Sequence, residues 1–175
     1  ERAIREGLVD KVPVYIQGMV WDVTAIHTTY PDFFNSKIKK AIFHRDQNPF
    51  LNEIFKRVAS HKEMMQIVEE TGPCIIMATS GMMQGGASVE YFRYLADNQK
   101  NSLVLTCYQG EGSLGRRLQN GEHEVVFQNG SNPEIVKVKM EIHSIHGFSG
   151  HSSRENLLAF IKLLSFSYQL LVTVA

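Results

Sequence analysis

Apolar residues in this chain occur in short continuous runs that alternate with segments of helical spacing. The run at 74–78 predicts a buried strand, and Val89 and Phe92 then mark one face of a helix over 88–96. A second apolar run at 103–107 predicts the next strand. Strand, helix and strand at this spacing form a βαβ unit, which implies a parallel sheet covered by helices.

The other predicted elements follow the same two patterns, with Gly or Pro near many of their ends. Apolar residues three or four apart, together with capping residues, predict helices at 1–10, 19–30, 61–71, within 110–121, and at 153–164. Apolar runs or alternation predict strands at 14–16, 55–59, 125–127, 135–138, 141–146 and 170–174. The strands at 125–127 and 135–138 flank Asn129-Gly130, so they are expected to pair antiparallel. The fold class is therefore α/β.

The charge balance limits the kind of nucleic-acid contact that this chain can make. It carries 18 Lys and Arg against 18 Asp and Glu, a formal net charge of zero. A protein that grips nucleic acid over a broad surface carries a basic excess, so any RNA binding is expected to be local or completed by another domain. No apolar stretch reaches the roughly 18 residues needed to cross a bilayer, so no membrane contact is predicted.

The two cysteines are predicted to be structural. Cys74 and Cys107 each lie in an apolar run, and no CxxC motif occurs. This context predicts two buried, reduced thiols rather than a redox pair or a cysteine zinc site.

The first candidate site is a glycine-rich turn between the strand at 74–78 and the following helix. Ser80, Gly81, Gln84, Gly85 and Gly86 lie in it. Such a turn presents free backbone N–H groups and the positive end of a helix dipole, which suits a phosphate oxygen. It is neither a Walker A loop nor GxGxxG. The pattern alone leaves open whether the glycines serve a ligand or only the turn geometry.

A second glycine-rich turn, 108–117, follows the strand at 103–107. Ligands collect at the carboxyl ends of parallel strands, so the two turns are expected to line one crevice. Arg116 and Arg117 then become candidate phosphate contacts because a guanidinium group matches phosphate oxygens bidentately. Solvated helix surface remains the alternative for both arginines.

Three of the seven histidines, His143, His146 and His151, lie close together in the sequence. His151 follows a Phe-Ser-Gly turn and precedes a helix capped by Ser152 or Ser153, so it could act as a general acid or base near neutral pH. The pattern leaves that role open. For His143 and His146 a core or surface position is favoured, because neither spacing is a zinc signature.

The order of three segments resembles the β-CASP family of metallo-β-lactamase nucleases: ATSGMMQGG, LTCYQGEGSLGRRLQNG and IHGFSGHSSRENLLAFI. The stretches VPVYIQGMVWDVTAIHTTYP and NPFLNEIFKRVAS extend the resemblance to nearly the whole chain. It is strongest to archaeal homologues of the nuclease subunit of the mRNA cleavage and polyadenylation specificity factor. The resemblance implies a three-layer α/β/α domain with a mainly parallel sheet, a zinc-dependent ribonuclease acting in mRNA 3′-end processing, single-stranded RNA as partner, and a cytoplasmic location.

The resemblance also implies specific roles. The family's motif B histidine matches His151, which would protonate the leaving oxygen, with Ser149 as a nearby phosphate contact. The two zinc ions belong to a metallo-β-lactamase domain with an HxHxDH motif, which does not occur here. The glycine turns (Ser80, Gly81, Gln84, Gly85, Gly86) and Arg116 would bind substrate. The chain itself is expected to bind no zinc and to be inactive alone.

The expected domain organisation is a β-CASP domain over 1–140 and a segment over 141–175 that returns to the metallo-β-lactamase domain. The chain opens without Met and in mid-pattern, which is typical of a piece of a longer protein. Motif A would precede Glu1. The family's motif C histidine would follow the strand at 170–174, but no histidine occurs there. Whether the tail at 165–175 is native therefore stays open.

Two other functions stay open at this point. The chain could be a non-catalytic RNA-binding or subunit-contact module, because some β-CASP relatives have lost their active residues. It could also be a small-nucleotide-binding α/β domain, an interpretation that rests on the glycine turns alone. Family members often dimerise, so a homodimer is among the expected partners, although nothing in the sequence shows an interface.

Overall fold

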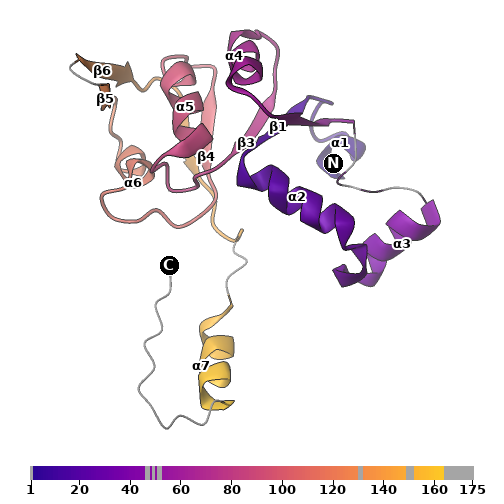
Figure 1. Ribbon diagram of the computed structural model, residues 1–175. Helices are drawn as coiled ribbons and strands as arrows, with labels where there is room; N and C mark the ends of the chain where they lie inside the picture. The colour runs from indigo at the N-terminus through magenta and orange to yellow at the C-terminus, as the bar shows by residue number, and fades with distance from the viewer. Residues whose placement is uncertain are drawn as a thin grey trace.

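The computed structural model describes residues 2–45, 48, 50, 53–129, 132–148 and 152–163. It shows a mixed α/β fold in which most strand pairs are parallel, so the predicted fold class is confirmed (Figure 1). The elements in chain order are α1 Arg2–Arg5, β1 Val14–Gln17, α2 Met19–Thr29, η1 Pro31–Phe33, α3 Ser36–Arg45, β2 Phe55–Val58, α4 His61–Glu69, β3 Ile75–Ala78, α5 Gly86–Leu95, β4 Ser102–Leu105, α6 Leu114–Gln119, β5 Glu124–Asn129, β6 Asn132–Lys137, β7 Glu141–Ser144 and α7 Arg154–Leu163.

The strands form three sheets. β2, β1 and β3 lie side by side in parallel, β4 pairs in parallel with β7, and β5 and β6 form the predicted antiparallel pair. The predicted β3–α5–β4 succession is present, but β4 takes β7 as its hydrogen-bonded neighbour instead of β3. The turns that follow β3 and β4 are joined by the side chain of Gln109.

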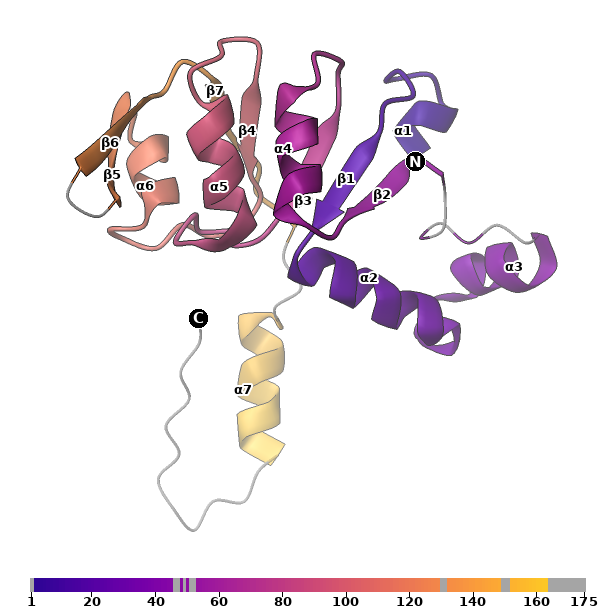
Figure 2. The ribbon, with the colours of Figure 1, turned by 45° about the horizontal axis from the view of Figure 1, so that its top comes forward.

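One face of the sheets carries the core, beneath α4, α5 and α6 (Figure 2). Met64 of α4 is fully buried, and Tyr91 of α5 lies in the same cluster. Burial raises the pKa of the Tyr91 hydroxyl to about 12. Ser60 begins α4 as predicted, because its hydroxyl accepts a hydrogen bond from the Glu63 N–H at 3.2 Å.

The opposite face of the sheets is largely open within the described residues. Side chains alternate along a strand, so Ile75, Met77 and Val104 point away from the core, and each is between 43% and 47% exposed. The helical layer of the α/β/α arrangement is therefore complete on one face only.

The ends of the chain differ most from the predicted elements. α1 is shorter than the predicted helix over 1–10, and β7 ends at Ser144 instead of 146. α7 begins as predicted, because the Asn156 N–H donates to the Ser153 hydroxyl at 3.2 Å. The predicted strand at 170–174 lies outside the described residues. Among the helices that are described, none combines the length and apolar composition needed to cross a membrane.

The prediction of two buried thiols is wrong for Cys107, which is exposed, whereas Cys74 is half-buried. β4 ends at Leu105, so Cys107 already belongs to the turn that leaves the sheet. Burial raises the pKa of the Cys74 thiol above its ordinary value.

Candidate functional site

Three segments leave the sheets at one edge. β1 and β3 run parallel with Gln17 opposite Ala78, and the first glycine turn, 79–86, follows directly. β4 and β7 also run parallel, and the Ile145 N–H donates to the Leu105 carbonyl at 3.0 Å. The second turn, 107–115, and the segment leading to His151 therefore start next to each other. We call turns 79–86 and 107–115 together the turn edge.

The first turn is closed by Ser80. Its N–H donates to the Gly85 carbonyl at 3.3 Å, and its hydroxyl oxygen accepts from the Gln84 N–H at 3.2 Å. The Ser88 hydroxyl donates to the Ser80 carbonyl at 2.7 Å. Met83 is buried, while the Gln84 side chain is exposed. Ser80 therefore holds the turn in shape, and Gln84 keeps its side-chain amide free for a ligand.

Free amide groups remain on the outside of this turn. The N–H groups of Gly81, Gly85 and Gly86 donate to no acceptor in the part of the chain that the structure describes. Gly85 and Gly86 lie at the start of α5, where the helix dipole is positive, and no side chain caps this helix. This is the arrangement that binds phosphate oxygens at helix N-termini.

Close backbone packing explains two of these glycines. Gly86 has φ +70°, and a Cβ there would lie 3.1 Å from the Thr79 carbonyl oxygen. A Cβ on Gly81 would lie 2.7 Å from the Cys107 Sγ in the other turn. The glycines therefore serve turn geometry as well as any ligand, so the two interpretations of the pattern are compatible.

Gln109 joins the two turns and is the residue that the sequence did not single out. Its side chain is 1% exposed, and its Nε2 donates to the Gly81 carbonyl at 3.0 Å and to the Cys107 carbonyl at 3.1 Å. The side chain also packs against Gly115 at the start of α6. A Gln between a strand and a glycine turn looks like an exposed amide in the sequence, so only the tertiary contact reveals it.

The two arginines of α6 are placed differently. The Arg116 guanidinium donates to the Gln109 carbonyl through Nε at 3.0 Å and Nη2 at 2.7 Å, and lies over the Tyr108 ring. Arg117 is paired with the Glu122 carboxylate, which raises the pKa of Arg117 through that hydrogen bond. The Arg116 guanidinium therefore contacts the turn edge, whereas that of Arg117 is paired with Glu122.

The histidine segment is described only in part. Ser149 and His151 lie outside the described residues. His143 is exposed on β7, with Nε2 3.0 Å from a Glu141 carboxylate oxygen, and His146 is exposed as well. These two fit the surface interpretation. Among the described residues, no three His, Cys, Asp or Glu side chains converge where they could hold a metal ion.

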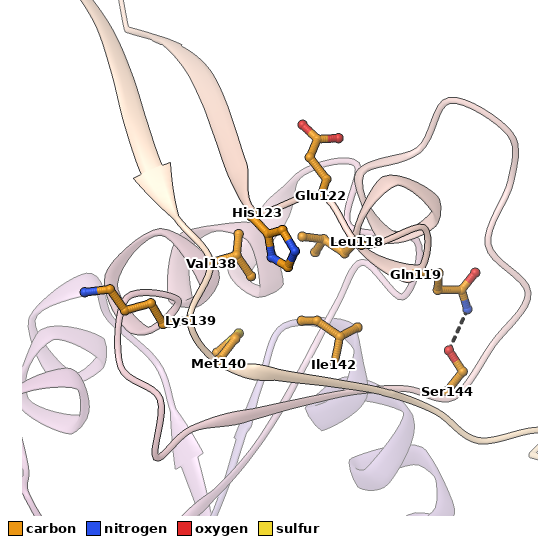
Figure 3. A pocket seen from close by; sticks show the side chains of 10 residues that line it. Leu118, Gln119, Glu122, His123, Val138, Lys139, Met140, Ile142 and Ser144 are labelled. Atoms are coloured by element: carbon orange, nitrogen blue, oxygen red, sulfur yellow. Dashed lines mark hydrogen bonds between the residues drawn. The ribbon is translucent and has the colours of Figure 1, made fainter.

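A cavity of about 370 Å³ lies beside α6 and β7 (Figure 3). It is lined by α6, the turn after it and the approach to β7, with Leu118, Met140 and Ile142 among its apolar residues. Gln119 and Ser144 close one side with a hydrogen bond of 2.8 Å. Among the site residues predicted from the sequence, none of those that the structure describes lines this cavity.

Comparison with known protein families gives one match in the N-terminal part of the chain and one in the C-terminal part. The Beta-Casp domain matches residues 1–118, and the Zn-dependent metallo-hydrolase RNA specificity domain matches residues 135–174. Transcription termination factor FttA is 47% identical over 164 residues in Methanosarcina mazei, 45% over 175 in Thermococcus kodakarensis and 43% over 163 in Lokiarchaeum. These alignments cover 93%, 99% and 93% of this chain but only 26%, 27% and 26% of the relatives.

The left-handed backbone at Gly86 gives a test of the turn geometry. We expect Gly86→Ala to lower the free energy of unfolding by about 1–2 kcal/mol, since an L side chain is strained at this φ. Urea denaturation measures the difference. Gly72→Ala is the matched control, because a Cβ there meets nothing within 4 Å. Equal losses in the two variants would show that the turn is not constrained as described.

Proposed function

This chain belongs to the β-CASP family, and from that premise we propose that it is the RNA-binding cap of a longer, zinc-dependent ribonuclease. The chain spans about a quarter of the length of the relatives that it matches, so the remaining domains lie in the rest of such a protein. We assign residues 1–140 to the cap and 141–175 to the segment that returns to the metallo-β-lactamase domain.

One observation carries this proposal. The N–H groups of Gly81, Gly85 and Gly86 have no acceptor among the described residues, and they lie in the turn that Gln109 ties to the end of β4, the strand that pairs with β7. A phosphodiester bound to these amides would therefore lie near the histidine that acts on it. The exposed amide of Gln84, the Ser80 hydroxyl, Ser149 and the Arg116 guanidinium would complete the substrate contacts.

The proposed reaction is hydrolysis of an RNA phosphodiester bond. His151 would hold a proton and give it to the leaving oxygen, the role of a general acid near neutral pH. The two zinc ions of the longer protein would supply the activated water and stabilise charge on the phosphate. The described residues of this chain do not offer a zinc ligand set, so we assign no step of that chemistry to them.

The relatives' name and the charge balance favour a second candidate. Those proteins are called transcription termination factors, and the formal net charge here is zero. The chain could therefore act as a non-catalytic module that holds RNA or a subunit of a cytoplasmic RNA-processing complex, as a monomer or as a homodimer. Mutation of His151 distinguishes the two candidates, because only the nuclease cap needs that side chain.

Arg116 and Arg117 form a matched pair for testing the RNA contact. We expect Arg116→Ala to weaken binding of single-stranded RNA, and to reduce the slope of log K against log salt by about 0.7, the loss of one phosphate contact. Fluorescence anisotropy at several salt concentrations measures both. Arg117→Ala should leave both unchanged, because its guanidinium is paired with Glu122. A similar loss of RNA affinity in both variants would indicate a general effect of positive charge and would contradict a specific phosphate contact at Arg116.

For the longer protein, we expect His151→Ala to slow cleavage of RNA by about 10²–10⁴-fold while zinc content and RNA affinity stay unchanged. Single-turnover cleavage of a labelled RNA measures the rate. His146→Ala is the control, since this nearby histidine is exposed and has no assigned role. Unchanged cleavage in His151→Ala would reject the nuclease-cap assignment and favour the non-catalytic module.

A further inference from the structure

A group of exposed aromatic and basic side chains lies at the far end of α2 from the turn edge. Phe33 is 88% exposed, Phe43 58% and Tyr30 57%. Lys37 and Lys40 of α3 lie between Phe33 and Phe43 in the sequence, and both are exposed. We call these five residues the aromatic–basic surface. No residue predicted from the glycine turns or from the histidine segment belongs to it.

The aromatic–basic surface rests on a packed support. His27 of α2 stacks on Phe50 with centroids 5.6 Å apart, and Phe34 stacks on Phe50 at 5.2 Å. Phe50 follows α3 in the chain, so these contacts tie the end of α2 to the segment beyond α3. Tyr30 and Phe33 contact each other edge to face at 6.4 Å. Phe33 therefore lies directly before Phe34, which belongs to this stacked support.

The charge of α3 is one-sided. Its sequence SKIKKAIFHR contains four of the chain's 18 Lys and Arg residues and no Asp or Glu. Lys37 and Lys40 form no ion pair with any residue that the structure describes. Lys40 and Phe43 are three positions apart, so they are neighbours on the helix surface. Asp32, in η1, is the exposed acid that precedes α3 in the sequence.

The position of this surface connects it to the turn edge. β1 and β3 end together, with Gln17 opposite Ala78, so α2 starts beside the first glycine turn. α2 has 11 residues, and at 1.5 Å per residue it spans about 16 Å. Figures 1 and 2 both show α2 leading away from the sheets toward α3. An extended RNA strand held at the turn edge could therefore continue along α2 to the aromatic–basic surface.

We infer that the aromatic–basic surface is a second contact for single-stranded RNA, where bases stack on Phe33, Tyr30 or Phe43 and phosphates meet Lys37 and Lys40. Exposed rings interleaved with lysines are the two components of sequence-independent single-strand binding: the rings take the flat faces of bases, and the lysines take the backbone charge. The inference rests on the RNA-binding half of the proposed function and does not involve His151.

Binding of a fluorescein-labelled oligouridine to the full chain tests the stacking component. We expect Phe33→Ala to weaken binding by roughly ten-fold. Phe33→Trp should retain the wild-type affinity, and Phe33→Leu should behave like Phe33→Ala because leucine has no flat ring to stack. An abasic oligomer with the same phosphates should bind all four proteins equally. Tyr94→Ala, which removes an exposed ring from α5, is the control and should bind oligouridine like the wild type.

The lysines give an independent arm. Lys40→Ala should reduce the slope of log K against log salt by about 0.7, while Lys100→Ala, an exposed lysine after α5, should leave it unchanged. The inference is overturned if Phe33→Ala binds oligouridine like the wild type. It is also overturned if Phe33→Leu binds oligouridine like the wild type, because an apolar side chain without a ring would then be enough and no base would stack on Phe33.

The outcomes separate this inference from the proposed function. If RNA is bound at the turn edge alone, Arg116→Ala weakens binding and Phe33→Ala does not, which overturns the inference. If the turn edge binds no RNA, Arg116→Ala has no effect, and a loss in Phe33→Ala still supports the inference. If the turn edge and the aromatic–basic surface bind one RNA strand, the losses of binding free energy in Arg116→Ala and Phe33→Ala should add, since the two sites share no contacts.

Discussion

The hydrogen bonds of the Gln109 amide are the constraint on which the candidate site depends. β3 and β4 have different hydrogen-bonded neighbours, so the sheet ladder does not hold their ends together. The buried Nε2 of Gln109 does so by bonding the Gly81 and Cys107 carbonyls. Since Arg116 in turn donates to the main-chain carbonyl of Gln109, this one residue contacts both glycine turns and the α6 arginine.

Parallel pairing supplies the rest of the arrangement. Because β1 and β3 run parallel, and β4 and β7 do too, the start of α2, both turns and the chain leading to His151 all leave at one edge. Ser80 closes the first turn through its hydrogen bonds, and the N–H groups of Gly81, Gly85 and Gly86 have no acceptor among the described residues. The proposed site therefore combines a backbone cradle with a histidine that follows β7 in the sequence.

Much of the fold follows from local patterns, whereas the contacts of the site do not. The apolar runs and the caps at Ser60 and Ser153 predicted most strands and helices, because these signals lie within a few residues. Pairing of β4 with β7 and burial of Gln109 depend on residues far apart in the sequence. Arg116 and Arg117 are adjacent and chemically identical, so only their contacts, with the Gln109 carbonyl and with Glu122, distinguish their roles.

The most direct test of the central claim is to map backbone amide shifts by NMR while a short oligoribonucleotide is added to the full chain. The account predicts that the largest shifts fall on the N–H groups of Gly81, Gly85 and Gly86, since phosphate oxygens would accept from them. Saturating RNA that leaves these three amides unshifted while amides elsewhere move would contradict it, because the turn edge would then not be the phosphate site.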